Sequence, residues 1–399
     1  MRHIFPLLLL AGVAACDARQ ADDAPAPAGQ LVESSAPRWS EADAWHLDPE
    51  PDVTIGEAHG APEHALAGVV GAARLSDDRI VIANFTTLDL RYFDARGRHI
   101  RTVGRRGNGP GEFQLIRGIG RAGDTVLVWD PFANRVSRFD ARGSFAGSTS
   151  MRVPEMVLPN LIGFLDDGSL LVRHDPNADK VTREGEHTTS VVYLRFSGTT
   201  GREIATLGPY FGREQFRAVI DNSAMSQGVI FGNRSMVAIA RAGVYRAESR
   251  RFQATLYAID GTPVRTLRRA HTPVRATSRD VAIQRKALEN YNEMVRNDPD
   301  LMAVQRRLAA KIPHRSTLPA ISQVRVDRQD NLWMQAYVPP DAEFAEWSVF
   351  DPEGHWLGVV PVPANLEVLE IGDDYLLAKT VDPLDDVERV VLHRLRKPR

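Results

Sequence analysis

Side chains that could bind a metal or act in catalysis are few in this sequence. No Gly-x-Ser-x-Gly sequence could present a serine nucleophile, and the 11 histidines include no His-Glu-x-x-His pair. Asp130 and His174 each end the predicted second strand of a repeating unit. The remaining equivalent positions hold Asn84, Arg241, Gln335 and Lys379. This mixed ring lacks the uniform donor set of a metal site. We therefore predict no metal, no cofactor and no catalytic residue.

A second group of side chains could bind a ligand. Basic and aromatic residues gather in segments that the repeats place on one face of the molecule. The ligand-binding candidates are Arg117, Asp130, His174, Arg241, Tyr245 and Arg246. Guanidinium and aromatic groups suit an anionic glycan, a carboxylate or an acidic peptide. The alternative is a solvated rim in which the arginines pair with neighbouring Asp and Glu side chains.

The N-terminus has the pattern of an export signal that ends at the only cysteine. Arg2 supplies a positive charge, and the apolar stretch that follows is shorter than the roughly 20 residues that span a bilayer. Val13-Ala14-Ala15-Cys16 resembles the bacterial lipobox. The resemblance implies a signal peptide of residues 1–15 and lipid attachment at Cys16, with the protein on the inner or outer membrane. An ordinary secretory signal with an incidental cysteine is the alternative.

The mature chain divides into a tether and one globular domain. Residues 16–38 are rich in Ala, Asp, Pro and Gln and have few large apolar side chains, so we expect a flexible tether. Residues 39–399 are expected to form the domain. The formal net charge of -2 gives no global attraction to nucleic acid, and no nucleic-acid partner is predicted.

A repeated phrase indicates the fold. Phe93–Gly97 recurs almost unchanged as Phe139–Gly143, and looser copies occur at 196–201, 259–261 and 350–354. Asp and Gly favour a hairpin turn, and predicted strands flank each copy. Two more strands precede each copy, which gives six units at a period of roughly 40–60 residues. This pattern predicts an all-β fold, a six-bladed β-propeller. A strand from residues 45–55 would complete the last unit and close the ring.

One linker has a more specific resemblance. Arg101–Gly104, followed by Gly107–Phe113, is similar to the segment between blades in NHL-type repeats, with its G-x-G-P-G-x-F sequence. Trp129-Asp130 and Asn134–Val136 fit the same pattern in the second unit. The whole chain resembles the six-bladed propeller lipoproteins of bacteria. The resemblance implies the fold and an envelope location, and it implies no activity.

Residues 278–312 break the β pattern. Val281 and Leu288 belong to a series of apolar residues at helical spacing, and Pro299 after Asp298 could begin a second helix. We therefore predict a helical hairpin inserted between blades four and five.

The predicted connections differ between the two faces of the propeller. Turns between first and second strands, and between third and fourth strands, are short. The other connections hold every long segment, including residues 209–227 and the helical hairpin. Because long ordered loops often carry function, we place the site on this loop-rich face, at the channel mouth, with the helices as a partial lid.

These observations leave three functions open. The leading hypothesis is a lipid-anchored binding or scaffold protein of the cell envelope, with its propeller in the periplasm, that holds a peptide, glycan or protein partner. The alternative is an enzyme acting at the channel mouth, either a metal-dependent hydrolase or lactonase, or a lyase. A subunit of a larger envelope assembly is the third possibility.

Overall fold

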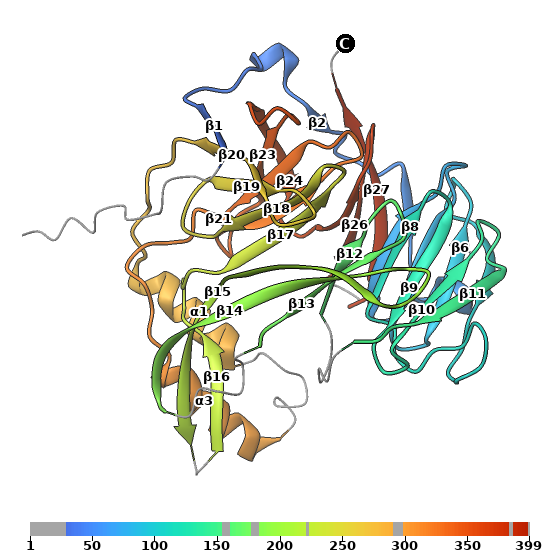
Figure 1. The fold of residues 1–399 in the computed structure, drawn as a ribbon, viewed down its shortest axis with the longest axis horizontal. Helices are drawn as coiled ribbons and strands as arrows, with labels where there is room; N and C mark the ends of the chain where they lie inside the picture. Colours follow the sequence, from blue (N-terminus) through green and yellow to red (C-terminus); the bar gives the residue numbers. More distant parts are fainter. Residues whose placement is uncertain are drawn as a thin grey trace, which may run out of the picture.

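Six β-sheets make up most of the molecule. The structure, a computed structural model, describes residues 29–153, 160–176, 183–220, 223–289, 298–382 and 386–397. Within these ranges the strands form six sheets of four or five strands (Figure 1). In each sheet, most neighbouring strands are also consecutive in the chain and antiparallel. The prediction of a mainly β chain with six sheet units is confirmed.

The first two sheets have the simplest organisation. Sheet 1 comprises β4 (Val69–Arg74), β5 (Ile80–Asn84), β6 (Asp89–Phe93) and β7 (His99–Val103). Sheet 2 comprises β8 (Gly118–Ala122), β9 (Thr125–Asp130), β10 (Arg135–Phe139) and β11 (Phe145–Ser150). The repeated phrase forms the turn between the third and fourth strands. Gly97 and Gly143 have φ of 78° and 79° there, which explains why glycine ends each copy.

Sheet 3 is longer than the sequence indicates. It comprises β12 (Asn160–Phe164), β13 (Leu170–His174), β14 (Gly185–Phe196), β15 (Glu203–Ile220) and β16 (Ser223–Gly228). The interpretation of residues 209–227 as a loop is wrong, because β15 and β16 extend through most of this segment. Ala218 and Ile220 of β15 are buried against helical residues such as Leu308, and this contact stabilises a strand that protrudes from the ring.

Sheet 4 corrects two predictions. It comprises β17 (Ser235–Ala240), β18 (Gly243–Glu248), β19 (Gln253–Tyr257) and β20 (Pro263–Arg269), with β1 (Gln30–Ser34) parallel to β20. Residues 235–240 are therefore the first strand of the unit, where the sequence interpretation made them the second. The expected tether is also too long, because β1 lies within it and extends the edge of the sheet. The Ser34 hydroxyl accepts a hydrogen bond from the Trp356 N–H of sheet 5.

Sheets 5 and 6 include strands from both ends of the chain. Sheet 5 comprises β21 (Ile321–Val326), β22 (Leu332–Ala336), β23 (Phe344–Phe350) and β24 (Trp356–Pro363). Sheet 6 comprises β25 (Glu367–Ile371), β26 (Tyr375–Val381) and β27 (Glu388–Arg396), with β2 (His46–Leu47) and β3 (Val53–Ile55) paired to β27.

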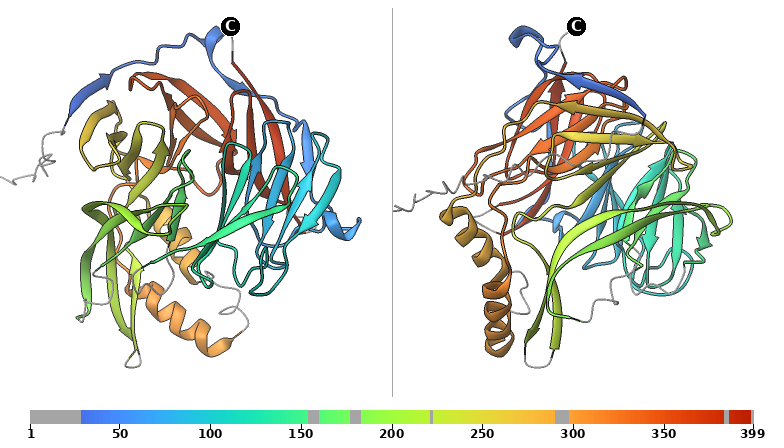
Figure 2. Two further views of the ribbon diagram at one scale, coloured as in Figure 1. Left: turned by 45° about the vertical axis from the view of Figure 1, so that its right-hand side comes forward. Right: turned by 60° about the vertical axis from the view of Figure 1, so that its left-hand side comes forward.

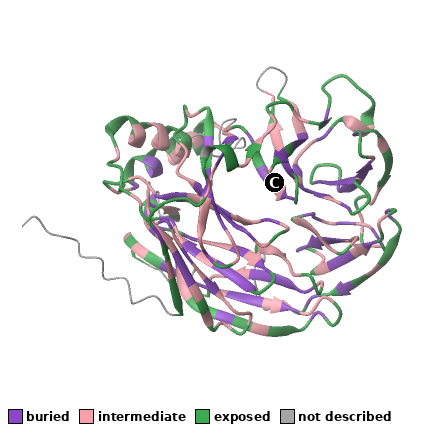
Figure 3. Ribbon diagram, turned by 90° about the horizontal axis from the view of Figure 1, so that it is seen from above, coloured by how far each residue is buried: buried purple, intermediate pink, exposed green. Residues whose placement is uncertain are grey.

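Buried apolar side chains lie between neighbouring sheets all around the molecule. Trp129 packs with Leu170 between sheets 2 and 3, and Trp333 packs with residues of sheet 6. Leu377 of sheet 6 packs in one cluster with residues of sheet 1. Figure 2 shows the sheets from two further directions, and Figure 3 shows that buried residues concentrate in the strands. This packing places the first strands of the sheets around a common centre.

Within the described residues, two α-helices lie between β20 and β21 in the chain. They are α1 (Ser278–Glu289) and α3 (Pro299–Lys311), and residues 290–297 lie outside the described ranges. The Asp298 carboxylate caps α3 by accepting hydrogen bonds from the N–H groups of Asp300 and Leu301. Two short 3-10 turns, η1 (Glu41–Asp43) and η2 (Pro62–His64), precede sheet 1. Because α3 packs on β15, the helices form a small core with the protruding strands (Figure 1).

Candidate functional site

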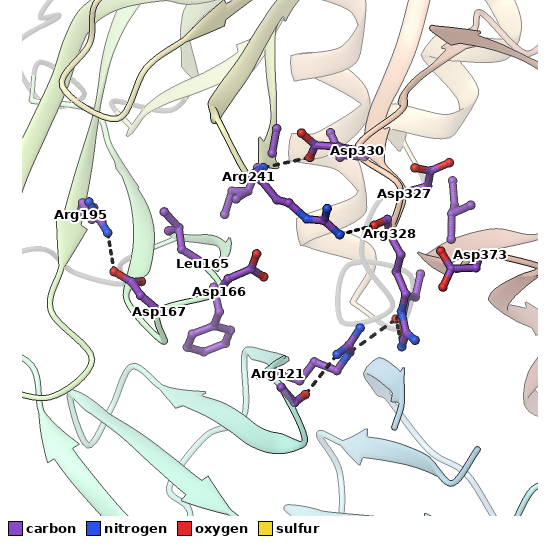
Figure 4. A pocket seen from close by; sticks show the side chains of 17 residues that line it. Arg121, Leu165, Asp166, Asp167, Arg195, Arg241, Asp327, Arg328, Asp330 and Asp373 are labelled. Carbon is purple, nitrogen blue, oxygen red and sulfur yellow. Dashed lines mark hydrogen bonds and ion pairs between the residues drawn. The ribbon is translucent and has the colours of Figure 1, made fainter. Parts of the chain in front are cut away.

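A cavity of about 760 Å³ opens at one end of the ring of first strands. The turns between the first and second strands of sheets 2 to 6 line it (Figure 4). We call it the channel-mouth cavity. Its acidic lining residues are Asp166, Asp167, Asp327, Asp330, Glu370 and Asp373, and its arginines are Arg121, Arg195, Arg241 and Arg328. This mouth is opposite to the loop-rich face, so the cavity lies on the face from which the sequence interpretation excluded the site.

Arg328 and Glu370 form an ion pair in the cavity wall. The Arg328 Nε donates to Glu370 Oε1 over 2.8 Å, and Nη2 lies 2.6 Å from the same oxygen. The Tyr375 hydroxyl also donates to Oε1 over 3.0 Å. Burial, followed by the charge of Glu370, raises the pKa of Tyr375, so its hydroxyl stays protonated and can donate. The Nε and Nη2 groups of Arg328 are therefore both bonded within the protein.

Arg195 is engaged in a similar way on the opposite wall. Its Nη2 lies 2.6 Å from Asp167 Oδ2, and its Nε donates to the Ser169 hydroxyl over 2.9 Å. Burial alone would raise the pKa of Asp167. Hydrogen bonds from Ser169 and the charge of Arg195 outweigh this effect, so the pKa of Asp167 is lowered. Asp167 is therefore ionised at neutral pH and paired.

Arg241 joins two turns of the cavity wall. Its backbone N–H donates to Asp330 Oδ1 over 2.9 Å, and its Nη2 donates to the Arg328 carbonyl over 2.7 Å. Figure 4 shows the Arg241 side chain running from its own turn towards Arg328. Arg241 is a predicted site residue, but the turn between β17 and β18 carries it, whereas the prediction put it at the end of a second strand.

Two carboxylates of the cavity, Asp166 and Asp373, make no close ion pair with the described residues, although the Lys397 ammonium acts on Asp373 at longer range. Asp166 and Asp373 are exposed, and neither makes a hydrogen bond or ion pair with its side chain among the described residues. Figure 4 shows them on opposite sides of the cavity, in the β12–β13 and β25–β26 turns. The arginines are held by the walls, so the groups available to a ligand are chiefly carboxylates. The site therefore favours cationic ligands over the anionic ligands that its arginines suggest.

Asp130 has a structural role that the sequence interpretation missed. It is completely buried at the end of β9. Its Oδ1 accepts hydrogen bonds from the N–H groups of Phe132 and Ala133, and its Oδ2 accepts one from the Gln114 N–H over 2.7 Å. This carboxylate holds a turn and a linker, so its assignment as a ligand-binding residue is wrong.

Tyr245 and Arg246 are also corrected. Tyr245 is 2% exposed and belongs to the core between sheets 4 and 5, where burial raises its pKa to about 12. Arg246 follows it in β18 and therefore points to the other face of the sheet. There it pairs with Glu248 over 2.6 Å and lies 5.0 Å from the centre of the Tyr210 ring. Neither side chain lines the channel-mouth cavity.

The remaining predicted residues do not gather into one site. Arg117 is exposed on the linker before β8, with its guanidinium carbon 5.5 Å from the centre of the Phe85 ring. His174 ends β13, half-buried, opposite Val192 of β14. Cys16 and the signal peptide lie outside the described residues. Arg241 is thus the one predicted residue that reaches the cavity, and Asp166 and Asp373 were missed because aspartate is a common turn residue.

No three His, Cys, Asp or Glu side chains in the described ranges are close enough to hold a metal ion. No helix in the same ranges is both long enough and apolar enough to span a bilayer.

Sequence comparison supports the architecture. The family DUF5128, described as a 6-bladed beta-propeller, matches residues 61–159, which contain sheets 1 and 2. The match and the six sheets described above identify the fold as a six-bladed β-propeller. A search of curated proteins found no relative of this sequence.

Several solved structures resemble the chain at low sequence identity. A Bacteroides fragilis protein described as exported is 12% identical, with 93% of this chain and 100% of that chain covered and a TM-score of 0.48. A DUF4221-family member from Bacteroides vulgatus is 9% identical, with coverage of 89% and 99% and a TM-score of 0.49. Virginiamycin B lyase from Staphylococcus aureus is 9% identical, with coverage of 88% and 99% and a TM-score of 0.39. Likeness of this degree does not extend an activity to this chain.

Proposed function

We propose that this chain is a binding protein of the cell envelope whose channel-mouth cavity holds a cationic group of its ligand. A peptide segment with lysine or arginine side chains is the ligand class that we favour. The observation that carries this proposal is the pair of carboxylates Asp166 and Asp373, which make no close ion pair among the described residues. Because the arginines of the wall are bonded within the protein, an excess of carboxylates faces the cavity and would attract a cationic group.

The volume and the lining of the cavity suit an extended side chain. Its volume of about 760 Å³ lies within the range of ligand sites. Phe164 and Ile239 line it together with the polar groups, so the methylene part of a lysine side chain would find apolar contacts. The ion pairs of Arg195 and Arg328 would keep the walls rigid while a ligand binds.

We also propose how the ring is completed and how the protein is held in the envelope. β2 and β3 would seal the ring by completing sheet 6, and α1 and α3 would form an insertion between the fourth and fifth blades. The linkers would be of the NHL type. A lipid on Cys16 would anchor the protein, and its propeller would face the periplasm. The lipobox sequence supports this anchoring.

The proposal is tested by calorimetric titration of the full chain in detergent with trilysine and with triglutamate. We expect trilysine to bind and triglutamate not to bind, and we expect binding to weaken at high salt because exposed charges are screened. The double variant Asp166→Asn/Asp373→Asn should bind trilysine about tenfold more weakly. Equal binding of both peptides, or no effect of the double variant, would reject the proposal.

A further inference from the structure

A second cavity, of about 380 Å³, lies on the loop-rich face. Its lining includes the connection of residues 227–234, Gln284 and Leu288 of α1, and Tyr337 after β22. β21 separates it from the channel-mouth cavity, because Ser322 near the start of the strand lines one cavity and Val326 at its end lines the other. The two cavities share no lining residue.

The charge of this second cavity is opposite to that of the first. Arg234 is exposed within it, and its Nη2 donates to the Ser322 carbonyl over 2.6 Å. No carboxylate of the described residues lies within ion-pair distance of its guanidinium. Although Arg234 is accessible to solvent, partial desolvation by the surrounding protein lowers its pKa.

The acidic residue in the wall does not offset Arg234. Glu214 lies 2.7 Å from Arg250 Nη2 and 3.0 Å from Arg315 Nε, so its charge is already compensated by two cations. Its Oε2 also accepts a hydrogen bond from the Asn233 N–H over 2.8 Å. The cavity therefore presents an accessible guanidinium in a wall without free negative charge among the described residues.

The rest of the wall combines apolar surface with an unused hydroxyl. The Tyr337 hydroxyl is buried and makes no hydrogen bond of regular geometry to the described residues, and its polar neighbour is the Gln284 side chain of α1. Phe231 packs edge-on against the Tyr337 ring, with centroids 5.9 Å apart. Phe231 has φ of 57°, which is strained for a non-glycine residue and is more common at binding sites. Leu288 and Ile321 add to the apolar lining.

We propose that this second cavity binds a small organic anion, namely a carboxylate with an apolar body. The carboxylate would accept charge-assisted hydrogen bonds from Arg234 and a hydrogen bond from the Tyr337 hydroxyl. The apolar body would lie against Phe231 and Leu288. Arg234 supplies the charge that selects an anion, and the volume limits the ligand to a small molecule.

The test compares two probes of the same shape. The full chain in detergent is titrated with phenylpropionate and with phenylpropanol, which lacks the negative charge. We expect phenylpropionate to bind at least tenfold more tightly, roughly the effect of one hydrogen-bonded charge pair. Equal affinity for the two probes, or no binding of phenylpropionate, would overturn the proposal.

Substitutions in the second cavity test whether phenylpropionate binds there. Arg234→Gln should weaken phenylpropionate binding about tenfold and leave phenylpropanol unchanged, and Tyr337→Phe should weaken it about fivefold. Arg105→Gln is the matched control, because Arg105 is an exposed arginine that pairs with Glu112 away from the cavity. Circular dichroism would show that each variant is folded. Unchanged binding by Arg234→Gln would overturn the proposal. Asp166→Asn/Asp373→Asn should not affect phenylpropionate, which separates this proposal from the proposed function.

Discussion

Arg328 Nη2 lies 2.6 Å from Glu370 Oε1, and this ion pair joins the turn of sheet 5 to the first strand of sheet 6. Glu370 Oε2 also accepts a hydrogen bond from the Arg74 N–H of sheet 1 over 2.9 Å. One carboxylate therefore connects three sheets at the channel mouth. The pair is largely shielded from solvent, with side chains 22% and 17% exposed, so its loss would leave donors without a partner.

Glu370→Ala is predicted to lower the free energy of unfolding by about 2–4 kcal/mol, because the Arg328, Tyr375 and Arg74 donors lose their acceptor. Urea titration monitored by circular dichroism measures the change. Glu367→Ala is the control on the same strand. Glu367 is 56% exposed and pairs with Lys379, so its loss should cost less than about 1 kcal/mol. Equal effects of the two variants would contradict this account of the wall.

Tyr245→Ala is predicted to act on stability and not on binding. The ring fills the core between sheets 4 and 5, so the cavity left by its removal should cost about 3–5 kcal/mol. Trilysine affinity should stay unchanged in any fraction that folds. Tyr245→Phe keeps the ring and should change stability much less. A strong loss of trilysine binding by the folded Tyr245→Phe variant would restore Tyr245 as a ligand-binding residue.

Removal of β1 is predicted to destabilise sheet 4. A chain that starts at residue 39 should unfold more easily than one that starts at residue 29, by about 2 kcal/mol, because it loses the pairing of β1 with β20. The exposed β20 edge should also promote self-association, which light scattering would detect. Identical stability and solution behaviour of the two chains would show that β1 does not contribute to the fold.

The repeated turns predict a dependence of stability on pH. Asp140 Oδ1 accepts hydrogen bonds from the N–H groups of Ser144 and Arg142, both over 2.8 Å. These donors hold the pKa of Asp140 below its usual range in the folded state. The contribution is therefore complete above about pH 4, the unfolded value, and disappears as the pH falls through the lowered pKa.

Asp140→Ala should lower Tm at neutral pH and reduce the decrease of Tm below about pH 4. Thermal unfolding at a series of pH values measures both effects. Glu353→Ala in the corresponding turn of sheet 5 is the control, because Glu353 is exposed and does not hold its turn. The same pH dependence in Asp140→Ala and in the unmodified chain would contradict the role of Asp140.

The fold was predictable where local pattern decides it. Turn residues such as Gly97 and Gly143 and alternating strands locate the six units. The errors arise where tertiary packing decides. Residues 228–231 look like a first strand of unit four, but Ile230 packs with the helices and pairs with His314 outside any sheet. β15 looks like a loop because the residues that bury its apolar face lie far away in the sequence.

The site was predictable only in small part. A polar residue at the end of a strand can face a channel or cap a turn, and the sequence does not distinguish the two. Asp130 caps a turn. The carboxylates Asp166 and Asp373 lie in short turns, where aspartate is expected for conformational reasons alone. Whether these two carboxylates are available to a ligand depends on which charged side chains lie near them, and only the folded structure determines those neighbours.

The most direct test of the account is hydrogen–deuterium exchange of the full chain with and without trilysine. If the channel-mouth cavity binds the cationic ligand, amides of the β12–β13 and β25–β26 turns, around Asp166 and Asp373, should exchange more slowly with trilysine present. Protection confined to the loop-rich connection of residues 227–234, or no protection at these two turns, would contradict the proposed site.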